Sequence, residues 1–103
     1  MIITKEQEET VINCGAFGYD AAKMASILQI EETEIASAMD DEYSQFSALL
    51  KKGRDMADYM IDEKLFQLAI TGDIKALEKL EARKRAREEE KIIKNKKRRH
   101  EGR

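Results

Sequence analysis

The side chains best able to do chemistry lie near the end of this 103-residue sequence, where basic residues gather. Residues 82–103 hold 11 Lys or Arg against 4 Asp or Glu, a net charge of +7, whereas residues 1–81 hold 8 against 17, a net charge of −9. The basic residues form two clusters, Arg83, Lys84, Arg85 and Arg87, and then Lys94, Lys96, Lys97, Arg98 and Arg99. Such clusters bind phosphate backbones without reading base sequence. The tail is therefore predicted to bind nucleic acid or an acidic partner, with a solubilising helix end as the alternative.

Double-stranded DNA is the nucleic acid that this pattern favours. No aromatic residue lies among the basic ones, so stacking on single-stranded bases is not expected. Residues 20–39 also fit a helix-turn-helix unit: Asp20 caps a first helix, Gln29 to Glu31 form a turn, and a second helix runs from Glu32 to Met39. The candidate DNA contacts in this unit are Lys23, Thr33 and Ser37.

The charge of the second helix contradicts that interpretation. The helix and its exit carry no Lys or Arg but six carboxylates, Glu31, Glu32, Glu34, Asp40, Asp41 and Glu42. Phosphates would repel this surface, so we expect it not to lie in a major groove in an isolated subunit. It is predicted instead to meet a basic protein surface or the basic tail of a neighbouring subunit.

No catalytic or metal-binding arrangement is recognisable. His100 stands between Arg99 and Glu101 in the tail, without the held geometry that a general base needs. Cys14 has no nearby histidine and is interpreted as a small apolar residue. Neither a phosphate-binding glycine loop nor a Cys/His cluster occurs, and the acidic run 40–42 lacks calcium-loop spacing. We therefore expect a protein that is not an enzyme, with no cofactor, metal or small-molecule substrate.

Composition predicts an all-α protein of one small domain, or a domain with a tail. The sequence has no Pro, 6% aromatic residues and 39% charged residues. Its single cysteine fits a reducing compartment. No apolar run approaches the length of a membrane span or a signal sequence, so a cytoplasmic location is expected.

The first helix of the chain is expected from Lys5 to Asn13. Thr4 and Gln7 match a capping box, and Gly15 occupies a position where helices often end. Gly18 then permits the turn into Asp20. In the helix-turn-helix unit, Ile35 and Met39 are expected to face the core, and Phe17 and Tyr19 to pack beneath it.

A long helix is predicted from about Ser44 to Thr71. Two rows of apolar residues follow it at helical spacing, and Gly53 is either a close approach or a break. Two apolar sides indicate two neighbours, one within the chain and the other in a second subunit, although a helix buried in a monomer fits equally well. The residues expected to build an oligomer are Phe46, Leu50, Tyr59, Met60, Phe66 and Ile70.

A sharp reversal is predicted at Gly72 and Asp73, a helix-ending glycine followed by a capping aspartate. The last helix begins at Ile74, with Ile74, Leu77 and Leu80 expected to face the long helix. We thus divide the chain into a helix-turn-helix domain (1–42), an oligomerising helical hairpin (43–81) and a basic tail (82–103).

This order of parts, and above all the phrase from Ala69 through Gly72-Asp73 to Ala76-Leu77, resembles the small terminase subunits of tailed bacteriophages. The resemblance covers roughly residues 4–85. It implies a ring-forming DNA-packaging protein in the cytoplasm of a host bacterium, which binds viral double-stranded DNA and presents it to the large motor-nuclease subunit. It maps the helix-turn-helix to residues 20–39 and the ring-building hairpin to about residues 44–81.

Two functions of other classes stay open at this point. The acidic helix-turn-helix could bind a basic protein surface, as an interaction adaptor or DNA mimic. The chain could also be a dimeric helix-turn-helix transcriptional regulator. Mass in solution separates these alternatives, because a ring contains many subunits and a regulator of this kind contains two.

Overall fold

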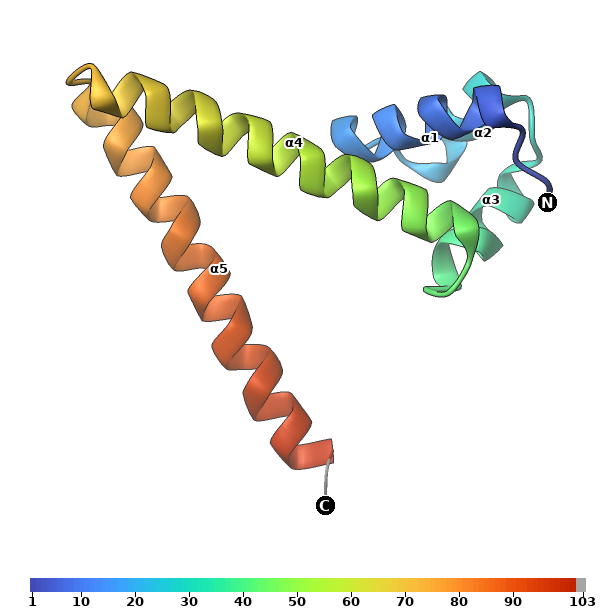
Figure 1. Ribbon diagram of the computed structural model, residues 1–103. Coiled ribbons are helices and arrows are strands. Elements are labelled where there is room, and N and C mark those ends of the chain that lie inside the picture. Colours follow the sequence, from blue (N-terminus) through green and yellow to red (C-terminus); the bar gives the residue numbers. More distant parts are fainter. Residues whose placement is uncertain (102–103) are drawn as a thin grey trace. The chain divides into compact units, whose positions relative to one another are not determined.

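The computed structural model describes the backbone of residues 1–101 and the side chains of residues 1–96, and every regular element in this range is a helix (Figure 1). The helices are α1 (Lys5–Phe17), α2 (Ala21–Leu28), α3 (Glu32–Asp40), α4 (Gln45–Ile70) and α5 (Ile74–Glu101). The all-α prediction is therefore confirmed. None of the described helices is both long and apolar enough to cross a membrane.

The chain forms two compact units, Met1–Met60 and Ile61–Arg103, which divide within α4. This boundary differs from the expected one after residue 42. The reason lies in the first half of α4, where Phe46, Leu50 and Gly53 are buried in the first unit. The N-terminal helices cannot enclose their core without these residues.

Helix α1 begins with the predicted capping box but ends later than predicted. The backbone N–H of Gln7 donates to Thr4 Oγ1 at 3.2 Å, and that of Thr4 donates to Gln7 Oε1 at 3.0 Å. The helix continues past Asn13 to Phe17, where Gly18 adopts the left-handed conformation (φ 71°) that ends it. The prediction that Gly15 terminates α1 is wrong, because Gly15 is a buried residue inside the helix.

Helices α1 and α4 cross in backbone contact at two glycines. A methyl group on Gly15 would overlap the backbone carbonyl of Leu50. A methyl group on Gly53 would overlap the carbonyl oxygen of Ile12 and lie 2.9 Å from the backbone nitrogen of Ala16. Gly53 therefore permits a close approach and is not a break in α4.

Helices α2 and α3 pack against each other across the short turn that the sequence indicates. Asp20 caps α2, since the backbone N–H of Lys23 donates to Asp20 Oδ1 at 2.9 Å. Gln29 ends α2 in a left-handed conformation (φ 56°), a rare one for a residue other than glycine. Helix α3 starts after Glu31, whose side chain makes no capping bond.

The core of the first unit joins all four of its helical segments. Its buried residues are Val11, Cys14, Met24, Leu28, Ile35, Phe46 and Leu50. Two expected contributors lie elsewhere: Met39 is 37% exposed and Phe17 is 65% exposed. Ala38, the residue directly before Met39, packs against the core instead. Phe17 is the last residue of α1, and its ring lies beside that of Tyr19, which packs against the core, with ring centroids 5.4 Å apart.

The second unit holds the end of α4 and helix α5, joined by Thr71, Gly72 and Asp73. Gly72 is left-handed (φ 100°), and Asp73 caps α5 by accepting from the backbone N–H of Ala76 at 3.0 Å. The predicted end of one helix at Gly72 and the capped start of the next at Asp73 are therefore confirmed. The predicted inward face of α5 is wrong. Ile74 is 70% exposed and Leu77 is also exposed, whereas Ala76 is buried and Leu80 half-buried. The first residue of α5 that is buried is thus Ala76, three positions after the capping Asp73.

Candidate DNA-binding and association surfaces

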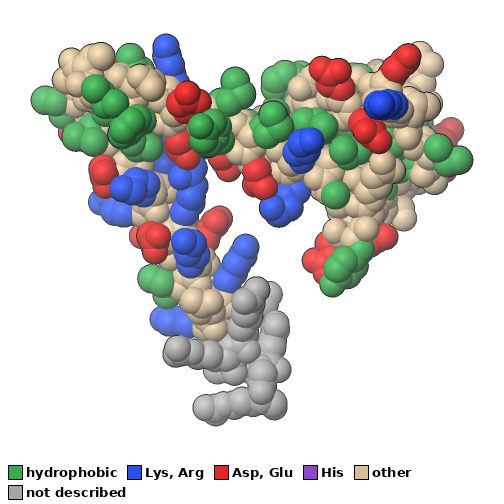
Figure 2. Space-filling view, viewed as in Figure 1, with side chains coloured by type: hydrophobic (Ala, Val, Ile, Leu, Met, Phe, Trp, Pro, Cys, Tyr) green, Lys and Arg blue, Asp and Glu red, His purple; other side chains and the backbone are tan. Residues whose placement is uncertain are grey.

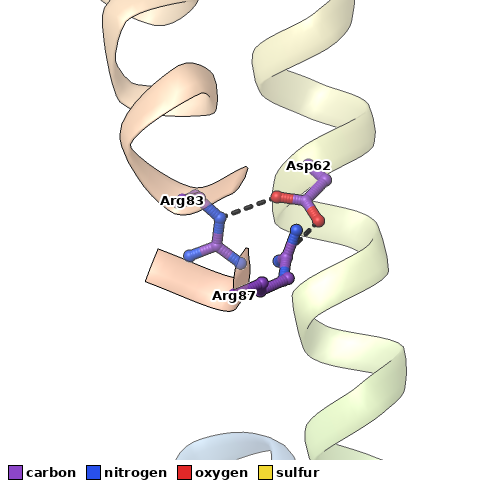
Figure 3. A network of polar contacts seen from close by, with 3 residues as sticks. All are labelled: Asp62, Arg83 and Arg87. Atoms are coloured by element: carbon purple, nitrogen blue, oxygen red, sulfur yellow. Dashed lines mark hydrogen bonds and ion pairs between the residues drawn. The ribbon is translucent and has the colours of Figure 1, made fainter. Parts of the chain in front are cut away.

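One carboxylate in the second unit binds two arginines (Figure 3). Asp62 on α4 accepts from Arg83 Nε through one oxygen and lies against the guanidinium of Arg87 through the other, both at 2.7 Å. Arg83 and Arg87 stand four residues apart on α5, so their side chains leave the same face of the helix. We call these three residues the Asp62 clamp.

The clamp lowers the pKa of the Asp62 carboxyl group. Partial burial of Asp62 by itself raises its pKa, but hydrogen bonds from Arg83 and Arg87, together with their positive charges, outweigh that effect. The net result is a pKa below the ordinary value of 3.8. Asp62 therefore stays ionised at neutral pH, and it was not among the residues selected from the sequence. The i, i+4 spacing of the two arginines was the only sequence signal of a shared acceptor.

The basic residues of α5 consequently fall into different environments. Arg83 and Arg87 tie α5 to α4, so they are part of the folded second unit rather than of a free tail. Lys84 and Lys91 lie at long ion-pair distances from Glu81 and Glu88, 3.8 and 3.7 Å. Arg85, Lys94 and Lys96 are exposed and form no ion pair with described residues. The side chains of Lys97, Arg98 and Arg99 lie outside the described residues.

Figure 2 shows blue basic side chains distributed along α5 among fewer red acidic ones. Exposed cations at several successive turns match the repeating negative charge of a duplex backbone. Helix α5 can therefore bind phosphates without any base contact.

The candidate contacts in the α2–α3 pair lie in a different electrostatic setting. The ammonium group of Lys23 lies 4.3 Å from the centre of the Tyr19 ring, a cation–π arrangement. Thr33 and Ser37 are exposed on α3. The six carboxylates of α3 and its flanks are exposed as well, and no Lys or Arg occurs between Met24 and Leu50.

Large apolar side chains are exposed along the second half of α4 and the start of α5. They include four of the residues expected to build an oligomer, Tyr59, Met60, Phe66 and Ile70. Met56, Ile74 and Leu77 join them, of which the last two were expected to face inward. Phe46 and Leu50 differ from these four residues, because both are buried in the core of the first unit. We call the exposed large apolar residues of the second unit at the end of α4 and the start of α5, Phe66, Ile70, Ile74 and Leu77, the apolar surface.

The remaining reactive groups offer no site in the described part of the chain. Cys14 is buried, and this burial raises the pKa of its thiol, which keeps it protonated at neutral pH. No group of three or more metal-binding side chains occurs among the described residues. The side chain of His100 lies outside them.

Comparisons with protein families, with curated proteins and with solved structures find no match to this chain.

Proposed function

We propose that this chain is a non-enzymatic, self-associating DNA-binding protein that acts in genome packaging, in the manner of a phage small terminase subunit. The observation that carries the proposal is the apolar surface. Phe66 is 53% exposed, and Ile70, Ile74 and Leu77, on the same unit, are exposed as well. Soluble monomers rarely leave so much apolar area uncovered, and such a surface is characteristic of a subunit interface.

Two further features support the DNA-binding part of the proposal. The exposed cations of α5 supply phosphate contacts, and the capped α2–α3 pair has the element order of a helix-turn-helix unit. Because α3 is acidic, we assign DNA binding chiefly to α5 and expect little sequence preference. The role of the α2–α3 pair is then to bind protein, or DNA only where other subunits supply positive charge.

The packaging role itself rests on the resemblance at Gly72-Asp73. It implies that the assembled subunits present viral DNA to a large motor-nuclease subunit. Co-expression with the motor-nuclease of the same phage genome tests this role. A complex that forms only when DNA or the assembled chain is present supports the role. The failure to form a complex under any of these conditions contradicts it.

DNA binding is tested by fluorescence anisotropy with a duplex at several salt concentrations. Reversing two exposed cations, Arg85→Glu with Lys94→Glu, should weaken binding and reduce the salt slope by about two, because each substitution removes one cation that neutralises a phosphate. Lys5→Glu with Lys52→Glu changes the net charge equally at exposed sites of the first unit and should bind almost as the wild type does. Equal weakening in both variants would show that net charge, not α5, controls binding.

The acidic surface of α3 favours a second candidate function, an adaptor or DNA mimic that binds a basic protein. Two facts support this candidate: six carboxylates are exposed on α3 and its flanks, and no Lys or Arg occurs from Met24 to Leu50. Glu32→Lys with Glu34→Lys separates the two functions. An adaptor loses its protein partner, whereas a DNA-packaging protein of the kind proposed gains DNA affinity, with a steeper dependence on salt.

A further inference from the structure

An open groove crosses the first unit between the N-terminal segment, α3 and the start of α4, with a volume of about 330 Å³. Its apolar lining comes from Met1, Ile3, Ala38 and Phe46. The polar lining is Glu34, Ser37, Asp41, Ser44 and Gln45. We call this feature the α3–α4 groove.

The groove combines an apolar floor with a negative rim. Phe46 is buried, and Ile3 and Ala38 pack against the core. Glu34 and Asp41 are exposed and form no ion pair among the described residues. Next to the groove, Tyr43 is 90% exposed in the turn between α3 and α4, where Figure 2 shows red and green side chains together. Such a surface fits a helix that carries both apolar and positively charged side chains.

Helix α5 carries that combination in its later part. Ile92 and Ile93 are exposed large apolar residues, and Lys91, Lys94 and Lys96 flank them. Isoleucine is unfavourable on a helix whose only neighbour is water, and neither residue is covered by the described part of the second unit. The segment therefore offers apolar contacts for the groove floor and ammonium groups for its rim.

We propose that the α3–α4 groove of one subunit binds the Lys91–Lys96 segment of a second copy. The inference rests on the proposed self-association, for which it names a second contact and both of its surfaces. Because the groove and the segment are different parts of the chain, each subunit can give its segment to one neighbour and receive that of another. We take this heterologous arrangement, since a reciprocal exchange between two copies would close a dimer and the proposed assembly is larger. Repeated contacts of this kind close into a ring or continue as a filament.

A second copy explains the groove better than DNA does, since Glu34 and Asp41 repel phosphates. The same lysines can still bind a duplex when the groove releases them. DNA and the groove therefore compete for the tail, and DNA at high concentration should displace it.

Paired charge reversals in the full-length protein test the contact. One variant reverses the groove, Glu34→Lys with Asp41→Lys, and the other reverses the tail, Lys91→Glu with Lys94→Glu. Each alone should weaken association by about tenfold or more, because like charges then face each other. An equal mixture should restore association in sedimentation velocity. In a mixture of ¹⁵N-labelled and unlabelled wild-type protein, a carbodiimide joins carboxylates to amines. It should cross-link Glu34 or Asp41 of one chain to Lys91 or Lys94 of another.

The control variant, Glu9→Lys with Glu63→Lys, changes the net charge as the groove variant does at exposed sites outside the groove, and it should associate as the wild type does. Circular dichroism of all variants establishes that they fold. The inference is overturned if the mixture associates no better than either variant alone, or if the cross-links join residues of the same chain. An association that Phe66→Glu abolishes but no charge reversal affects would overturn the groove contact and leave the proposed self-association standing.

Discussion

At the scale of single residues, two glycines determine how closely α1 and α4 approach. Gly15 and Gly53 each lie against backbone atoms of the other helix, and no side chain is available to move aside. Helix propensity alone would favour alanine at both positions by about 1 kcal/mol. Backbone contact must therefore outweigh propensity at these two sites.

Gly53→Ala should accordingly destabilise the first unit by about 1–3 kcal/mol, the usual cost of overpacking, instead of stabilising it. Lys52→Ala, at the adjacent exposed position of α4, is the control and should change stability by less than about 0.5 kcal/mol. Urea unfolding followed by circular dichroism measures both. A Gly53→Ala protein as stable as the wild type would mean that the two helices do not cross in backbone contact.

The Asp62 clamp makes the stability of the folded protein depend on pH, with a sign that the pKa shift determines. Since the pKa of Asp62 is lower in the folded chain than in the unfolded one, its contribution to stability is complete above the unfolded pKa, about 3.9. That contribution is lost as the pH falls through the lower folded pKa. Melting temperatures measured from pH 7 to pH 2.5 should therefore fall more steeply at the acid end for the wild type than for Asp62→Asn.

Glu63→Gln removes an exposed carboxylate next to the clamp and serves as the control, which should melt in parallel with the wild type. Parallel curves for Asp62→Asn and the wild type would show that the two arginines do not hold this carboxylate in solution.

Cys14 provides a second test at a single residue. Its burial and raised pKa predict slow reaction with a thiol reagent at neutral pH in the folded protein and rapid reaction in denaturant. Absorbance of the released chromophore records both rates. Rapid labelling without denaturant would contradict the packing of Cys14 in the core.

At the scale of helices, local rules predicted where most elements begin. The caps at Thr4, Asp20 and Asp73 are confirmed, because each depends on residues within four positions of one another. The faces that helices turn inward were predicted less well. Met39 is exposed and Ala76 is buried, since helical spacing cannot distinguish between adjacent positions once a neighbouring helix fixes the rotation.

The candidate sites divide in the same way. The basic clusters and four of the apolar residues could be selected from composition and spacing, and the structure leaves their described members on the surface except Arg83 and Arg87. Asp62 and the α3–α4 groove could not be selected, because both arise from residues far apart in sequence. Gly15 was misinterpreted for the same reason: only its packing against Leu50 reveals its purpose.

Truncation of α5 at two positions separates its structural and binding roles. A chain ending at Ala82 lacks Arg83 and Arg87 with the rest of the tail, so it should have neither DNA binding nor the clamp. A chain ending at Glu90 retains the clamp but lacks the 7 basic residues of positions 91–103. It should melt near the wild-type temperature and bind DNA weakly, with a reduced salt slope. Unchanged affinity of the chain ending at Ala82 would show that DNA binds outside the basic tail, and unchanged affinity of the chain ending at Glu90 would confine the DNA contacts to residues 82–90.

At the scale of the whole molecule, the division of charge and the apolar surface indicate one mode of action. An acidic first unit followed by a basic helix favours contacts between unlike parts of neighbouring chains. The apolar surface gives those contacts a hydrophobic contribution that salt does not screen. In an assembly, several copies of α5 would be available to one duplex wherever DNA displaces them from the groove, and their weak phosphate contacts would then act together.

Self-association is tested most directly by the mass of the protein in solution, measured by light scattering and native mass spectrometry at tens of micromolar. We expect an assembly larger than a dimer, and Phe66→Glu, which charges the apolar surface, should reduce it to smaller species. Gln67→Glu introduces the same charge at the adjacent exposed position and should leave the assembly intact. A wild-type monomer, unchanged by Phe66→Glu, would contradict the proposal that this protein acts as an assembly.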